Sequence, residues 1–92
     1  MIKHGLVSVG TTATALNTAD TSTSAQRITI LVTNPTGGAT VYLGGAGVTT
    51  TSYGYILAAQ GELSIDINAD EVLYGVVASS TQSVAVLKQG VK

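Results

Sequence analysis

The segment "ELSIDIN", residues 62–68, alternates polar and apolar side chains at every position. Leu63, Ile65 and Ile67 fall on one side of an extended chain, and the polar residues fall on the other side. Such strict alternation is typical of a β-strand that has one buried and one solvated face. We therefore expect the chain to be a sheet protein, and we examine the flanking sequence for the same pattern.

The period of two recurs on both sides of this segment. Two earlier stretches, "RITILVTN" (27–34) and "ATVYLG" (39–44), also alternate. Two later stretches, "EVLYGVVAS" (71–79) and "QSVAVLKQ" (82–89), are apolar on both faces. This predicts central strands, or strands whose outer face meets another subunit.

Short runs of turn-forming residues separate these stretches. "NPTGG" (34–38) contains a proline with a preset φ and two glycines, while "AAQGE" (58–62) and "NADE" (68–71) have the composition of short connections. "SSTQ" (79–82) is predicted to be the tip of a hairpin. The spacing predicts an all-β fold, a small antiparallel β-sandwich or β-barrel of about seven to eight short strands.

The N-terminal part of the chain is harder to interpret from its pattern. Residues 1–26 are predicted to form a strand or arm with a short strand around Thr14–Leu16, followed by a polar loop. We expect this part to belong to the same domain as a β-sandwich core at residues 27–92.

Composition excludes several classes of protein. Charged residues make up 10% of the 92-residue chain, against about 25% in a typical globular domain. The net charge is −1, and the four cations are scattered, so we expect no nucleic-acid partner. No apolar run approaches the roughly 20 residues of a membrane span, so no membrane partner is expected either. The cations are Lys3, Arg27, Lys88 and Lys92.

The reactive side chains form no motif for catalysis or metal binding. His4 is the single histidine, there is no cysteine, and no serine lies in a G-x-S-x-G elbow. Glu62 and Asp66 are expected on the solvated face of one strand. The segment "NADE" (68–71) lacks the ligand spacing of an EF-hand loop, and "GGAG" (44–47) lacks the lysine and helix of a phosphate-binding loop. We therefore predict no enzyme activity, no metal site and no cofactor.

The segment "VYLGGAGVTTTSYGYIL" (41–57) contains no acid, base, histidine or cysteine. It offers shape, backbone hydrogen bonds and the rings of Tyr42, Tyr53 and Tyr55. Tyrosine is enriched at interfaces because it brings a large contact area at low entropic cost. The tyrosines are therefore candidate interface residues, although packing of the loop onto the sandwich explains them equally well.

Roughly the C-terminal three-quarters of the chain resembles small accessory proteins of tailed bacteriophage virions. The resemblance covers residues 41–91, and the preceding "ITILVTNPTGGATVYLGG" (28–45) is similar to the opening hairpin of the same proteins. It rests on strand and turn residues and includes no catalytic signature. The matching elements are Val41–Gly45, Val48–Thr49, Gly54–Leu57, Gly61–Glu62, Leu63–Ile67, Leu73–Ser79 and Val84–Leu87.

This resemblance implies a structural virion protein that decorates or cements the capsid. The implied partners are the major capsid protein and further copies of the chain, as a homotrimer or a symmetric cluster. The implied location is the capsid surface, after synthesis in the host cytoplasm. Val77, Ala85 and Leu87, which the predicted core does not use, are the candidate contact residues. The alternative is a host- or carbohydrate-binding module of a head fibre or tail, in which Tyr53 and Tyr55 stack on a sugar.

Overall fold

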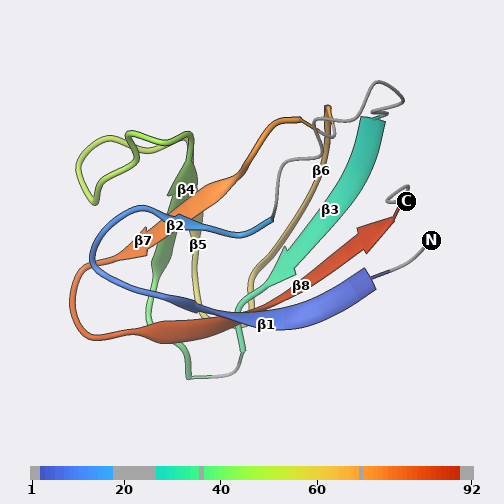
Figure 1. Cartoon of the computed structure of the whole chain (residues 1–92). Helices are drawn as coiled ribbons and strands as arrows, with labels where there is room; N and C mark the ends of the chain where they lie inside the picture. The colour runs from blue at the N-terminus through green and yellow to red at the C-terminus, as the bar shows by residue number, and fades with distance from the viewer. Residues whose placement is uncertain (1–2, 18–26, 36, 69, 90–92) are drawn as a thin grey trace.

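The computed structural model describes residues 3–17, 27–35, 37–68 and 70–89, and these residues form strands and no helix. No helix in these ranges is therefore long and apolar enough to cross a membrane. The all-β prediction is confirmed (Figure 1). The strands are β1 (Lys3–Val9), β2 (Thr14–Ala15), β3 (Arg27–Thr33), β4 (Val41–Gly44), β5 (Tyr55–Leu57), β6 (Glu62–Asn68), β7 (Tyr74–Val77) and β8 (Gln82–Gln89).

The strands form two antiparallel sheets. Sheet A has the order β1-β8-β3-β6, and sheet B has the order β2-β7-β4-β5. In Figure 1 sheet A lies to the right and sheet B to the left. This is the strand order of an eight-stranded jelly roll, a form of β-sandwich in which the chain passes repeatedly between the two sheets.

The alternating segments form strands with the faces that their patterns predict. On β3 the side chains of Ile28, Ile30 and Val32 are buried. On β6 the apolar residues are half-buried and the polar ones exposed, and Ile65 pairs with Ile30 across the ladder. Cross-strand neighbours share a face of the sheet, so both strands turn their apolar side chains toward sheet B.

The core lies between the sheets and is made almost wholly of aliphatic side chains. Full burial of each such side chain contributes about 1.5–3 kcal/mol. Gly75 of β7 allows close packing here, because a Cβ at this position would lie 3.2 Å from Cγ1 of Val41 and 3.3 Å from Cδ2 of Leu43. The buried cluster comprises Val9, Leu16, Ile30, Val32, Val41, Leu43, Leu57, Leu73, Val77, Val84 and Val86.

The last two strands are central, as predicted, but they do not form a hairpin. β7 lies between β2 and β4 in sheet B, whereas β8 lies between β1 and β3 in sheet A. The prediction that residues 79–82 form a hairpin tip is therefore wrong. This segment carries the chain from one sheet to the other, with Ser80 in the left-handed region at φ 60°.

The N-terminal residues belong to both sheets. β1 is an edge strand of sheet A, and β2 is an edge strand of sheet B. The predicted short strand near Thr14 is confirmed, although it is limited to Thr14–Ala15. The predicted polar loop lies mostly outside the described residues.

Two buried asparagines connect loops to the sandwich. Asn34, at the end of β3, is fully buried, and its Nδ2 donates hydrogen bonds to the carbonyl oxygens of Ala39 (2.7 Å) and Leu57 (3.1 Å). Asn17 donates from Nδ2 to the carbonyl of Glu71 (2.9 Å) and accepts at Oδ1 from the backbone N–H of Leu73 (2.8 Å). These side chains satisfy backbone groups that the strand ladders leave unpaired.

Candidate interaction surfaces

The titratable side chains are dispersed over strand faces and turns. His4 is exposed on β1. Oδ1 of Asp66 accepts a hydrogen bond from Thr29 Oγ1 (2.6 Å), and Oε1 of Glu71 accepts one from the backbone N–H of Asn68 (2.8 Å). Within the described ranges, no three His, Asp or Glu residues are close enough together to hold a metal ion.

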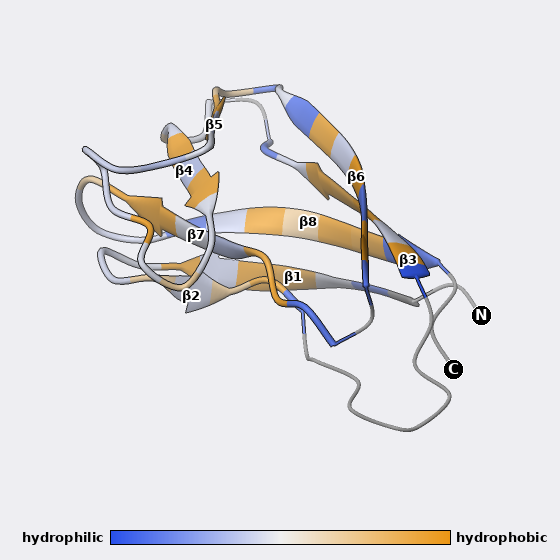
Figure 2. Cartoon of the chain, turned by 90° about the horizontal axis from the view of Figure 1, so that it is seen from above, coloured by the Kyte–Doolittle hydropathy of each residue, from blue (hydrophilic) through white to orange (hydrophobic). Residues whose placement is uncertain are grey.

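The outer face of sheet A carries an open apolar surface. The register places Leu6 of β1 opposite Ala85 of β8, and Leu31 of β3 opposite Leu87 of β8. Leu6 is 77% exposed and Leu87 is 41% exposed. We call these four residues, Leu6, Leu31, Ala85 and Leu87, the outer patch. Figure 2 shows the hydrophobic residues along β8, the strand that lies between β1 with Leu6 and β3 with Leu31.

Two shallow hollows deepen the outer patch. One, of about 180 Å³, lies around Leu6, Leu31, Ala85 and Leu87. The other, of about 200 Å³, lies on the far side of Leu31 and Leu87, toward Ser64. Aliphatic side chains around a concave surface can receive apolar groups of a partner and release the water that covers them.

Part of the outer face of sheet B, near Gly44, is covered by its own loop, whereas Ile56 on the same face is 48% exposed. Val48, in the glycine-rich loop 45–54, is only 6% exposed. A Cβ on Gly44 of β4 would lie 3.2 Å from Cγ2 of Val48, so the glycine makes room for this contact. The loop returns to the sheet where the N–H of Gly54 donates to the carbonyl of Leu43 (2.8 Å). The small and apolar residues of this region therefore let the loop pack on the sheet, with Val48 against Gly44.

The candidate tyrosines do not converge on one site. The rings of Tyr42 and Tyr53 contact each other, with centroids 5.0 Å apart and planes inclined at 50°. Tyr55 pairs with Leu43 across the β4–β5 ladder, whereas Ile56 pairs with Tyr42. Because residues along a strand alternate between faces, Tyr55 belongs to the opposite face from Tyr42. Tyr53 and Tyr55, each less than half exposed, therefore do not form a joint stacking platform.

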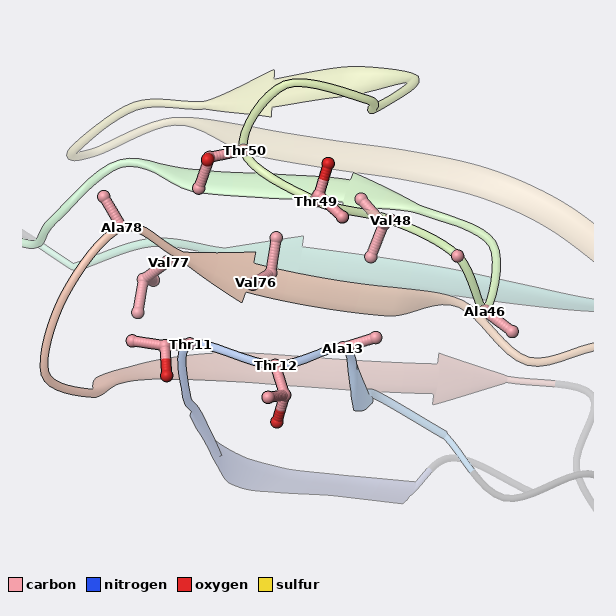
Figure 3. Close-up of a pocket in the computed structure, with 11 residues that line it drawn as sticks. Thr11, Thr12, Ala13, Ala46, Val48, Thr49, Thr50, Val76, Val77 and Ala78 are labelled. Carbon is pink, nitrogen blue, oxygen red and sulfur yellow. The ribbon is translucent and has the colours of Figure 1, made fainter.

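A groove of about 410 Å³ separates loop 45–54 from the residues that follow β1. Figure 3 shows Thr11 and Thr12 on one side of this groove, Thr49 and Thr50 on the other, and Val76 between them. Four threonines line the groove, and Val76 and Val77 add a small apolar surface. Its lining contains no charged side chain.

The structure corrects one candidate interface residue and adds another. Val77 is 1% exposed and part of the core, so it is not available to a partner. The prediction was wrong because β7 is buried on both faces, with Val76 2% exposed on the other side. Ala85 and Leu87 are exposed, as their candidacy requires. Leu6, the most exposed large apolar residue in the described part of the chain, was missed because residues 3–9 were not predicted as a strand. The signal was present, since Leu6 is out of phase with Val7 and Val9.

The comparisons with known proteins support the fold. A solved structure described under "Bacillus endospore appendages form a novel family of disulfide-linked pili" matches with a TM-score of 0.54 and 12% identity. The match covers 96% of this chain and 85% of that chain. This chain has no cysteine and so cannot form a disulfide link of the kind named there. No family model and no curated protein sequence matches.

Proposed function

We propose that this protein is a non-catalytic structural subunit that decorates or cements the capsid of a tailed bacteriophage through the outer patch of sheet A. The observation that carries this proposal is the patch itself, where Leu6 and Leu87 remain exposed after the core is complete. Exposed apolar surface of this kind marks contact sites in proteins.

The size of the sheet face suits such a contact. A stable interface takes about 800 Å² from each partner, and the chain exposes 5126 Å² in total. One face of the sandwich can supply an area of this order. The core of an interface is also poor in charged residues, and all members of the outer patch are uncharged.

Three further features agree with an assembly role. The chain carries few charges, which limits repulsion between neighbouring copies on a shell. The similar solved structure comes from Bacillus endospore appendages, which are pili. The resemblance of residues 41–91 to accessory proteins of phage virions directs the proposal to the capsid surface, with the major capsid protein as partner.

Co-sedimentation with capsids tests the proposal. Empty capsids of the encoding phage are mixed with the wild-type protein and with two variants that each place a lysine on an exposed apolar position. Leu87→Lys alters the outer patch, and Ile56→Lys alters a 48% exposed residue of sheet B. We expect the wild type and Ile56→Lys to sediment with capsids and Leu87→Lys to remain in the supernatant. Wild-type protein that stays in the supernatant would refute the proposal.

One feature favours the alternative of a host- or carbohydrate-binding module. A hollow of about 320 Å³ lies beside Tyr53 and is lined by backbone of Gly44, Gly45 and Gly47. An aromatic ring and backbone polar groups are elements of a sugar site. The double substitution of Tyr53 and Tyr55 by alanine separates the two functions. Loss of glycan binding with intact capsid binding would favour the module, and the reverse result would favour assembly.

A further inference from the structure

The edges of the two sheets differ in their ability to accept another strand. β2 and β5 have two and three residues, too few for a stable ladder. β6 is seven residues long, but its exposed side chains include Glu62 and Asp66. Charges along an edge strand discourage pairing with another chain. Sheet B is thus closed by short edges, and one edge of sheet A is guarded by acidic residues.

The opposite edge of sheet A carries its one permanent charge, Lys3, at the end of the strand and none at its centre. β1 is also seven residues long, "KHGLVSV", and it contains neither an acidic residue nor a proline. In the part of the chain that the structure describes, it pairs with β8 alone (Figure 1). Its central residue is Leu6, which is 77% exposed. A long edge strand with an exposed apolar centre is a template for strand addition.

We propose that two copies of this chain associate through β1, pairing antiparallel across a two-fold axis to join their A sheets into one continuous sheet. A two-fold contact uses the same surface on both subunits, so each free β1 finds its complement in the other. Full overlap of residues 3–9 places Leu6 opposite Leu6 of the partner subunit. It also places His4 opposite Ser8 of the partner subunit.

This register agrees with the charges and the hydrogen bonding of the strand. Lys3 lies opposite Val9 of the partner subunit, so the cationic ends of the two strands are at opposite ends of the pair. The full overlap supplies about six to eight backbone hydrogen bonds between the chains. Pairing β1 with β6 of another copy would instead set Leu6 against the polar, acidic face of that strand, without an apolar partner.

The dimer would also enlarge the surface that the proposed function uses. A two-fold axis perpendicular to the sheet keeps both outer faces on the same side, and Leu6 lies at the junction. The two outer patches therefore become continuous. The biological purpose of the dimer rests on the proposed structural role. The β1–β1 contact itself is separate from the capsid contact and can be tested without capsids.

The oligomeric state in solution gives the first test. Sedimentation velocity is measured at protein concentrations up to about 1 mM, where even weak association is populated. We expect the wild type and Ile56→Lys to shift from the 9.2 kDa monomer to a dimer. Leu6→Lys sets like charges opposite each other and should weaken association at least about tenfold. A wild type that stays monomeric, or a Leu6→Lys variant that dimerises as the wild type does, would overturn the inference.

Cysteine cross-linking tests the register, since the natural chain has no cysteine. Directly opposed residues have Cβ atoms about 4.5–5.5 Å apart, near the reach of a disulfide. We expect Leu6→Cys to give a reducible dimer under mild oxidation and Ile56→Cys to give none. His4→Cys and Ser8→Cys should cross-link when mixed and not alone, because like positions lie about 14 Å apart. Cross-linking of Ile56→Cys equal to that of Leu6→Cys would contradict the register.

The two proposals fail in different ways. Capsid binding by a wild-type protein that stays monomeric in solution would end the dimer and leave decoration intact. A wild-type dimer that cross-links at Leu6 and does not sediment with capsids would support the dimer and end the proposed function. Circular dichroism and thermal unfolding of each variant verify that the sandwich is folded, which the exposure of Leu6 and Ile56 leads us to expect.

Discussion

Replacement of Asn34 by aspartate should destabilise the protein far more than its small change in shape suggests. The Nδ2 group of Asn34 donates to two carbonyl oxygens, those of Ala39 at 2.7 Å and Leu57 at 3.1 Å. Asn34→Asp removes both donors and places a carboxyl oxygen against both carbonyls. Oδ1 of Asn34 already lacks a hydrogen-bond partner, so the introduced carboxyl would find no donor on that side either.

The magnitude follows from these contacts. A buried carbonyl that loses its donor costs about 1–3 kcal/mol; the bond to Leu57 is buried, whereas the bond to Ala39 is partly buried and contributes less. Burial of a carboxyl without a partner adds to this cost. We expect a loss of about 3–5 kcal/mol, from a stability that is about 5–15 kcal/mol for typical domains. In a domain of this size each kcal/mol lowers Tm by about 4–8 °C, so the expected fall in Tm is roughly 12–40 °C.

Asn17 provides the matched control. Asn17→Asp loses one donor, to the carbonyl of Glu71, but keeps an oxygen to accept the N–H of Leu73. We expect a loss of about 1–2 kcal/mol. Both variants are compared with the wild type by thermal and urea unfolding at pH 7. If the free energies of unfolding of Asn34→Asp and Asn17→Asp differ by less than about 1 kcal/mol, the assigned role of the Asn34 amide is wrong.

The pH dependence of Asn34→Asp gives a second readout with a definite sign. Burial without a donor should raise the pKa of the introduced carboxyl above its unfolded value of about 3.9. The folded state then binds more protons than the unfolded state between these two pKa values. The stability of the variant relative to wild type should therefore fall as pH rises from about 4 through the raised pKa.

Two further predictions concern glycine and loop packing. Gly38→Ala should lower the free energy of unfolding, measured by urea titration, by about 1–3 kcal/mol, because its Cβ would collide with Oδ1 of Asn34. Gly45→Ala, whose Cβ would meet no other atom, should cost far less. Equal losses in the two variants would contradict this account. Val48→Ala should cost about 1–3 kcal/mol, because Val48 is 6% exposed, whereas Leu6→Ala at a 77% exposed position should stay within about 0.5 kcal/mol. A neutral Val48→Ala variant would show that the loop does not pack on sheet B.

Sequence patterns predicted where the strands lie along the chain better than they predicted which strands pair in each sheet. The alternation in β3 and β6 identified both strands and their buried faces, because that pattern depends only on local backbone geometry. The same information could not show that β7 and β8 belong to different sheets, since the partner of a strand is set by contacts distant in sequence. The tyrosine-containing loop was equally consistent with docking and with packing. The contacts of Val48 with Gly44 and of Tyr53 with Tyr42 show that it packs on the sheet.

The exposed face of β8 and the buried strand β7 show the same limit of sequence-based prediction. Ala85 and Leu87 were identified from the apolar outer face of the last strand, and both are exposed. Val77 had a similar sequence environment, yet it faces the core, while its neighbour Val76 is buried on the other side of β7. Sequence alone could not distinguish a covered outer face from an open one, because the cover of sheet B comes from another part of the chain.

The sequence by itself determined that this chain is all-β, weakly charged and without a motif for catalysis, since these properties follow from residue types and their period along the backbone. The tertiary structure decided which surface is left open. Loop 45–54 folds over part of sheet B, while among the residues that the structure describes β1 pairs with β8 alone and Leu6 of sheet A is exposed. The physical reason is that burial is a property of pairs of segments, and which segments meet depends on the path of the chain between the two sheets.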